Sequence, residues 1–231
     1  MATSAEPRST SRSLPAPEVP RTLREALPVF LRFGSPRLLI ALLAATIGVR
    51  LALGGFSAWD FVPVGGLVLL WPLEEWLIHV FILHARPRRV FGRVVDFEVP
   101  RKHREHHGDP WKLELLFIPM SSFVYSLPLL GLVWFAVTPS AALAWTGITA
   151  HLALALHYEW VHFLVHTRVV PRARYYQRLW KNHRRHHFKN EHYWFGVTML
   201  SGDRLLRTGP AHETVPTSPT ARTLEGVGSP G

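Results

Sequence analysis

The sequence predicts an all-α integral membrane protein: a bundle of about four transmembrane helices with a cytoplasmic helical cap that holds a binuclear metal site. Three observations support this class. Four apolar stretches are each long enough to cross a bilayer, which takes about 20 helical residues. Lys and Arg concentrate in alternate connections between these stretches. Ten of the fourteen histidines form four short clusters near the ends of the second and fourth stretches and in the basic segments that follow them.

The chain divides into a membrane domain and two tails. Residues 1–27 are basic and rich in Ser, Pro and Ala, so we expect a disordered N-terminal tail. Residues 28–208 form the predicted membrane domain, with spans at about 36–56, 61–84, 115–137 and 141–166. Residues 209–231 are rich in Pro, Thr and Gly and are expected to form a disordered C-terminal tail. Because the chain has no cysteine, any metal site must use histidines and carboxylates.

The distribution of positive charge predicts the topology. Lys and Arg precede the first span, fill the connection between the second and third, and follow the fourth, whereas residues 54–60 and 138–140 carry none. The positive-inside rule therefore places both termini and the histidine clusters in the cytoplasm. We expect a multi-pass protein of the cell membrane if bacterial, or of the endoplasmic reticulum if eukaryotic. The net charge of +10 comes without a nucleic-acid recognition motif, so no nucleic-acid partner is expected.

The histidine clusters have spacings that place several rings on one helix face. Their members are His79 and His84; His103, His106 and His107; His162 and His166; and His183, His186 and His187. Positions i, i+3 and i+4 share a face, so each H-x2-HH cluster presents three rings in one direction. His79 and His84 differ, because five residues of an ideal helix turn the second ring about 140° from the first. That pair requires a local distortion, or its rings serve different metals.

The clusters belong to an internal near-repeat. A Glu-Trp step precedes the first and third clusters, at Glu75 and Glu159, and each pair is followed by a basic segment and an H-x2-HH cluster. The repeat predicts two half-sites of five histidines, residues 79–107 and 162–187, that face each other. Ten imidazoles are too many for one ion and suit two ions with open positions.

Five further residues are candidates for an outer shell around the ligands. We interpret Glu75 and Glu159 as acceptors that orient imidazole N–H groups, the alternative being interface residues that snorkel or pair with Arg. His157, His192 and Asp203 are further candidates for this role, the alternatives being packing, solvation or loop capping.

The ordered set of four histidine clusters resembles the fatty acid hydroxylase/sterol desaturase superfamily of integral membrane oxygenases. Residues 176–198, which include F-G-V-T, are similar to the last histidine box of that superfamily, and the resemblance covers about residues 69–208. It implies that the ten histidines hold two non-haem irons, which zinc can replace in a purified sample, with O2 as co-substrate. It also implies hydroxylation or desaturation of a C–H bond in a lipid such as a fatty acyl chain, sterol or carotenoid. No cytochrome b5-like domain is recognisable, so we expect a separate donor of the cytochrome b5 or ferredoxin type with its reductase.

Two other classes remain as alternatives. A zinc-dependent membrane hydrolase would need fewer histidines and a base such as that of an H-E-x-x-H helix, which the sequence lacks. A membrane metal-binding or transport protein would place its ligands near the midplane of the bilayer, whereas these histidines lie at the predicted cytoplasmic edge.

Overall fold

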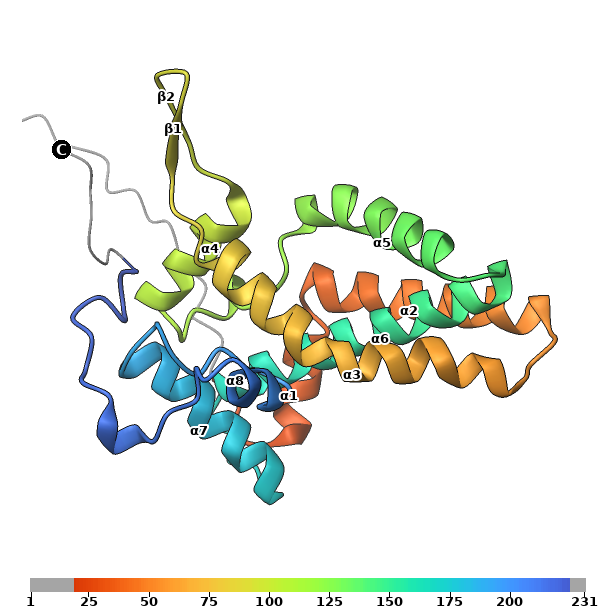
Figure 1. The fold of residues 1–231 in the computed structure, drawn as a ribbon. Coiled ribbons are helices and arrows are strands. Elements are labelled where there is room, and N and C mark those ends of the chain that lie inside the picture. Colours follow the sequence, from red (N-terminus) through yellow and green to blue (C-terminus); the bar gives the residue numbers. More distant parts are fainter. Residues whose placement is uncertain (1–18, 225–231) are drawn as a thin grey trace, which may run out of the picture.

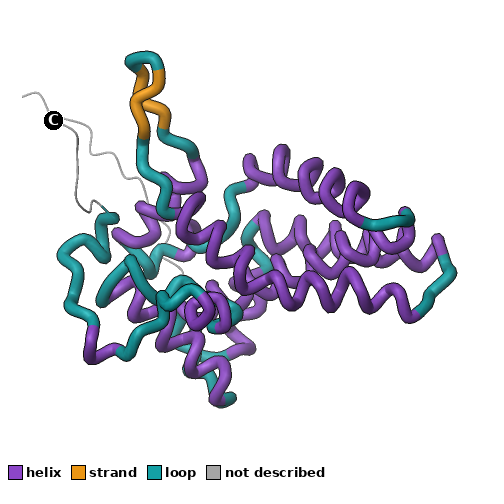
Figure 2. The backbone as a smooth tube through the Cα atoms, in the orientation of Figure 1, coloured by secondary structure: helices purple, strands orange, loops and turns teal. Residues whose placement is uncertain are grey.

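The computed structural model describes residues 19–224, and this part of the chain is mostly helical (Figures 1 and 2). Four helices form an elongated bundle: α2 (Gly34–Leu53), α3 (Phe61–Leu77), α5 (Phe123–Val137) and α6 (Ala141–Val165). Shorter helices gather at one end of the bundle: α1 (Leu23–Phe30), α4 (Glu98–Gly108), α7 (Arg174–Phe188) and α8 (Ser201–Leu205). The connections 54–60 and 138–140, which lack Lys and Arg, lie at the other end.

Helix α6 is the centre of the bundle and packs against α2, α3 and α5. Leu39, Phe123, Ile148 and Leu152 form the core of these contacts. The approach of α5 is close at Gly147, where an added Cβ would lie 2.2 Å from the Trp134 ring. Since α6 carries His162 near its C-terminal end, the helix that organises the bundle also positions part of the site.

Three stretches within residues 19–224 are long and apolar enough to cross a membrane: Gly34–Leu53, Ala58–Leu83 and Leu113–Val137. Helix α6 has a comparable length of 25 residues, but it contains polar side chains such as His151 and Glu159. The mostly helical class and the membrane-protein character are therefore confirmed, while the fourth crossing stays a prediction.

The third predicted span starts later as a helix than expected. Helix α5 begins at Phe123, and residues 113–122 contain two short 3-10 turns in place of the helix predicted from residue 115. Pro119, which lacks a backbone N–H, separates the turns and interrupts helical hydrogen bonding. The segment leaves backbone groups of Leu116 and Ile118 free for the site described below.

The structure describes residues 19–27 and 209–224 of the two predicted tails, and residues 1–18 and 225–231 lie outside the described residues. Helix α1 begins at Leu23, inside the expected N-terminal tail, because Thr22 caps it by accepting a hydrogen bond from the Glu25 N–H (3.3 Å). At the other end, residues 209–224 lie along the cap instead of forming a disordered tail. The Ser218 N–H donates to the Lys189 carbonyl, and side chains of the cap donate to carbonyls of this segment, as Trp194 does to Pro210 and Asn190 to Pro216.

A small antiparallel hairpin, β1 (Arg88–Val90) and β2 (Arg93–Val95), projects from the cap and corrects the strictly all-α prediction (Figure 1). Its turn places Phe91 and Gly92 at positive φ, of 48° and 77°. The two strands are joined by the two-residue turn Phe91-Gly92, and a short turn that contains glycine is a local signal for a hairpin.

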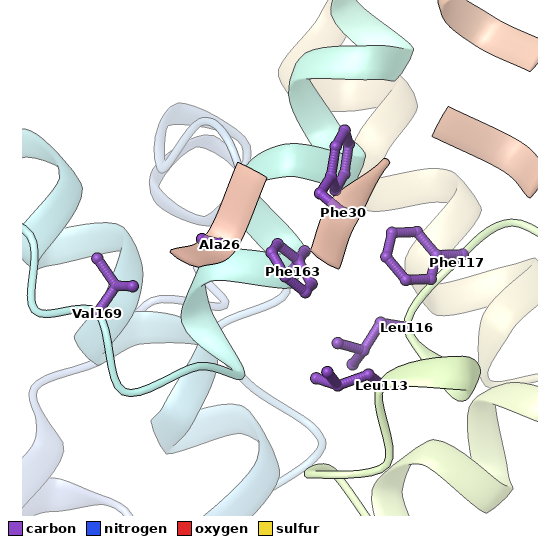
Figure 3. Packing of buried hydrophobic residues seen from close by; sticks show 7 residues of the cluster. All are labelled: Ala26, Phe30, Leu113, Leu116, Phe117, Phe163 and Val169. Atoms are coloured by element: carbon purple, nitrogen blue, oxygen red, sulfur yellow. The ribbon is translucent and has the colours of Figure 1, made fainter. Parts of the chain in front are cut away.

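Helix α1 and the 113–117 segment pack against the C-terminal end of α6 and the turn that follows (Figure 3). The buried residues of this cluster are Ala26, Phe30, Leu113, Leu116, Phe117, Phe163 and Val169. The Phe30 ring lies 5.5 Å from the Phe163 ring, centroid to centroid. This packing fixes the backbone of Leu116 beside the histidines of α6.

Candidate metal centre

The ten clustered histidines converge at the cap end of the bundle and form two groups, here named site 1 and site 2. Site 1 contains His79, His84, His103, His107 and His186. Site 2 contains His106, His162, His166, His183 and His187. In each site, one ligand atom from every ring lies within 4.8 Å of the others. The sites adjoin, because the ring centroids of His107 and His187 are 4.1 Å apart.

The two sites do not follow the predicted half-sites, because each H-x2-HH cluster sends its middle ring across. His106 on α4 belongs to site 2, and His186 on α7 belongs to site 1. The reason is helical geometry: relative to position i, position i+4 is rotated by about 40° one way and position i+3 by about 60° the other way. The rings at i and i+4 therefore share one ion site, and the ring at i+3 points to the neighbouring site.

A π-helical segment resolves the irregular spacing of His79 and His84. The chain leaves α3 as a π-helix over Ile78–Leu83, and the His84 N–H donates to the His79 carbonyl at 3.1 Å. An i to i+5 bond of this kind brings the two residues onto one face, and π-turns recur at functional sites. Both rings belong to site 1, so of the two predicted explanations the local distortion is the one observed.

Backbone carbonyls fix four of the rings through Nδ1. His79 donates to Phe195 (2.7 Å), His107 to Ala221 (2.8 Å), His162 to Leu116 (2.9 Å) and His186 to Tyr193 (2.8 Å). An Nδ1 that donates leaves the lone pair of the neutral ring on Nε2. Such outer hydrogen bonds are characteristic of histidines that bind metals.

The residues present fit two metal ions. The Nε2 atoms of two ring pairs lie 3.0 Å apart (His183 and His187) and 3.2 Å apart (His84 and His186). These distances match the separation of about 3 Å between two nitrogens that bind one ion at right angles, each about 2.1 Å from it. Within the described residues, the buried Nε2 of His79 has no hydrogen-bond partner. Burial, and then the neighbouring imidazoles, lower the pKa of His106 and His187 well below the ordinary value, so these rings are neutral and able to bind a cation.

Glu75 holds a loop and not an imidazole, which corrects the predicted role. Its carboxylate accepts from the backbone N–H groups of Val197, Thr198 and Met199 (2.7, 2.7 and 3.3 Å) and from the Thr198 hydroxyl (2.9 Å). Because the loop continues from Phe195, Glu75 acts on His79 indirectly, through the position of the Phe195 carbonyl.

Glu159 has the matching arrangement in site 2. Its Oε1 accepts from the Ile118 N–H (2.9 Å) and from the Ser35 hydroxyl (2.5 Å). Two residues before Ile118, the Leu116 carbonyl accepts from His162. In both halves of the near-repeat, the glutamate therefore accepts from the N–H two residues after the carbonyl that orients a site histidine, His79 or His162. Ser35 was not predicted, because nothing in its sequence surroundings indicates a partner on α6.

The remaining outer-shell candidates divide by position. Asp203 accepts from the N–H groups of Phe195 and Gly196, both at 2.9 Å, and so supports the same loop as Glu75. His157 packs against Tyr176, and the His192 ring is exposed beside Glu191; neither belongs to a site. The four carbonyl acceptors were missed because a backbone oxygen has no sequence signature.

Comparison with known proteins places this geometry in a family. The sequence model of the family "Fatty acid hydroxylase" matches residues 64–208, which is more than half of the chain and includes all ten histidines of sites 1 and 2. The chain belongs to the fatty acid hydroxylase family.

Curated proteins that are similar to this chain come from a plant and a yeast. The chain is 27% identical over 143 residues to dihydroceramide fatty acyl 2-hydroxylase FAH2 of Arabidopsis thaliana, covering 62% of this chain and 58% of the relative. It is 30% identical over 145 residues to ceramide very long chain fatty acid hydroxylase SCS7 of Saccharomyces cerevisiae, covering 61% of this chain and 36% of the relative. The chain thus spans less than two thirds of the length of these relatives.

A solved structure has the same fold as this fatty acid hydroxylase family member. The structure of full-length Scs7p, in which only the hydroxylase domain is visible, aligns with a TM-score of 0.63 at 24% identity. The alignment covers 80% of this chain and 68% of the other. This likeness supports the helical architecture around the two sites.

Proposed function

We propose that this fatty acid hydroxylase family member is a membrane-bound oxidoreductase that hydroxylates a fatty acyl chain of a lipid. Sites 1 and 2 hold two non-haem iron ions, O2 is the co-substrate, and a separate protein delivers the electrons. The observation that carries the proposal is the pair of adjoining, all-histidine, five-ligand sites. The names of the relatives, which are fatty acyl and ceramide hydroxylases, favour hydroxylation of an acyl chain over desaturation or a sterol substrate.

The protein's part in this reaction is to hold neutral imidazoles in a buried cluster. When bound, the two irons supply the redox chemistry that oxidises an unactivated C–H bond with O2 and external electrons. Each site would offer its ion five neutral imidazoles, a ligand type that suits iron. Glu75 and Glu159 keep the loops in place that orient His79 and His162, so ligand positions depend on buried anchors in the bundle.

Charge and architecture support a cytoplasmic site with four crossings. The bundle end that carries sites 1 and 2 also carries the basic segments, and the opposite end has the two connections without Lys or Arg. Under the positive-inside rule this orientation exposes the cap to a cytoplasmic electron donor. A lipid acyl chain would reach sites 1 and 2 from the bilayer, because the sites lie at the end of the bundle where its helices meet the cap.

The ligand set favours an oxygenase over a zinc hydrolase. Both sites consist of imidazoles alone, with no carboxylate among the ligand groups formed by residues 19–224. Catalytic zinc sites of hydrolases are usually satisfied by three protein ligands and a water.

The proposal is tested by purifying the protein without oxygen, measuring iron and zinc per chain, and then adding reductant, O2 and ceramides or fatty acyl lipids. We expect two metals per chain and a product that has gained one oxygen atom, whose position fragmentation mass spectrometry assigns. His162→Ala removes a site 2 ligand and should abolish the product. His212→Ala is the matched control, because this ring belongs to neither site. Two irons without an O2-dependent lipid product would contradict the hydroxylase proposal.

A further inference from the structure

The C-terminal residues 216–224, here named the strap, contact the chain segments that carry the ligands of site 1. Ser218 donates its N–H to the Lys189 carbonyl (2.7 Å), and the Asn190 amide donates to the Pro216 carbonyl (3.1 Å). These bonds attach the first half of the strap directly after α7, the helix that carries His186. In Figure 1 the blue C-terminal segment runs along the cap from α8 toward α4.

The second half of the strap reaches a metal ligand. The Ala221 carbonyl accepts from His107 Nδ1 at 2.8 Å, and Ala221 is buried. Arg222 donates from Nε to the His107 carbonyl (3.0 Å) and from Nη2 to the Gly108 carbonyl (2.7 Å), which fastens the strap to the end of α4. Thr220 donates to the buried carboxylate of Glu191 (2.5 Å).

The acceptor carbonyl of the strap lies in a different part of the chain from the other three acceptor carbonyls. The carbonyls of Leu116, Tyr193 and Phe195 lie within residues 64–208, the region that the family model matches, whereas Ala221 lies beyond it. Of the four rings fixed by a carbonyl, His107 alone relies on a segment outside that region. Loss of such an outer partner typically lowers metal affinity about 10-fold to 100-fold.

We propose that the strap is a positioning element of site 1, which holds the His107 ring with Nε2 toward the metal. Occupancy of site 1 then depends on the strap, whereas occupancy of site 2 does not. The inference rests on the proposed metal centre, since it concerns how a ligand of that centre is oriented.

The test compares two truncations of the full chain by metal content after dialysis against graded chelator. A chain that ends at Thr217 lacks the contacts to His107, and a chain that ends at Leu224 keeps them. We expect the shorter chain to lose one metal at a chelator concentration at which the longer chain retains both. That concentration should be at least about 10-fold lower than the one that removes a metal from the longer chain. Adding His162→Ala to the shorter chain should remove the remaining metal, and adding His84→Ala should not, which locates that metal in site 2.

A full-length pair of variants guards against misfolding of the truncated chain. Thr220→Val with Arg222→Ala loosens the strap, and Glu213→Ala with Thr214→Val is the matched control in an exposed turn. The first pair should weaken one metal only, and the control neither. Equal loss of both metals, or retention of both by the loosened and truncated chains, would overturn the role of the strap. A full chain without any metal would overturn the metal centre itself, and the strap's role with it.

Discussion

Site 1 and site 2 contain equal numbers of imidazoles but are held in different ways. In site 1, three rings donate Nδ1–H to loop carbonyls at Tyr193, Phe195 and Ala221. In site 2, only His162 among the described residues has such a bond, and the Nδ1 atoms of His106, His183 and His187 are buried without a partner. Site 1 is thus completed by segments late in the chain, whereas site 2 is set mainly by the direct packing of α4, α6 and α7.

The comparison shows how a near-repeat in sequence produces two unequal sites. Each half supplies a glutamate that binds a loop, and each loop orients a ligand. The carboxylates of Glu75 and Asp203 both accept hydrogen bonds from the loop at residues 195–199. Glu159 accepts a further hydrogen bond from the Ser35 hydroxyl. Substitutions in loops should therefore affect site 1 more than site 2.

The largest expected effect comes from the exchanged ligands. His186→Ala should empty site 1 although it lies on α7, and His106→Ala should empty site 2 although it lies on α4, with loss of activity in both. Metal analysis of double variants checks this assignment. His186→Ala with His84→Ala should still hold about one metal, because both residues serve the same site, whereas His186→Ala with His162→Ala should hold none. If the first double variant held no metal and the second held about one, His186 would belong with His162 to the predicted half-site of residues 162–187.

An intermediate effect is expected at two glycines with no room for a side chain. A Cβ on Gly196 would lie 2.4 Å from the Met199 carbonyl oxygen, and a Cβ on Gly147 would lie 2.2 Å from the Trp134 ring. Each Ala substitution should destabilise the protein by about 1–3 kcal/mol. Only Gly196→Ala should also release metal from site 1, because it moves the loop of Phe195. Thermal unfolding combined with metal analysis separates the two effects; metal loss from Gly147→Ala alone would reverse the expectation.

The smallest expected effect is the difference in stability cost between substitutions of the two glutamates. Glu75 uses both oxygens for four donors, so Glu75→Gln turns an amide N–H toward the Met199 N–H or the Thr198 hydroxyl and should cost about 1–3 kcal/mol. Glu159 Oε2 has no partner among the described residues, so Glu159→Gln can keep both existing bonds and should cost less than about 1 kcal/mol. Unfolding of the metal-free variants measures the difference, and equal costs would show that the glutamates act alike.

Much of the site could be predicted from spacing, because histidine side chains carry their own signal. The ten residues, their place at the span ends and the family are consistent with the structure and the comparisons. The exchange of His106 and His186 was missed, although it follows from the rotation between i+3 and i+4. A local distortion between His79 and His84 was one of two explanations, and the π-helix that supplies it was not predicted. Backbone carbonyls such as that of Ala221 could not be predicted, since their role depends on tertiary position alone.

The fold shows the same division between local and tertiary information. Apolar stretches indicate the bundle, and Thr22-x-x-Glu25 is a local signal for the start of α1. Order in residues 209–224 had no local signal, because those residues are held by hydrogen bonds to distant parts of the chain.

Anomalous diffraction at the iron absorption edge, from iron-loaded protein, tests the central claim most directly. We expect two peaks, one surrounded by His79, His84, His103, His107 and His186, and the other by His106, His162, His166, His183 and His187. A single peak, or two peaks in which His106 and His186 stay with the other rings of their own half of the chain, would contradict the account.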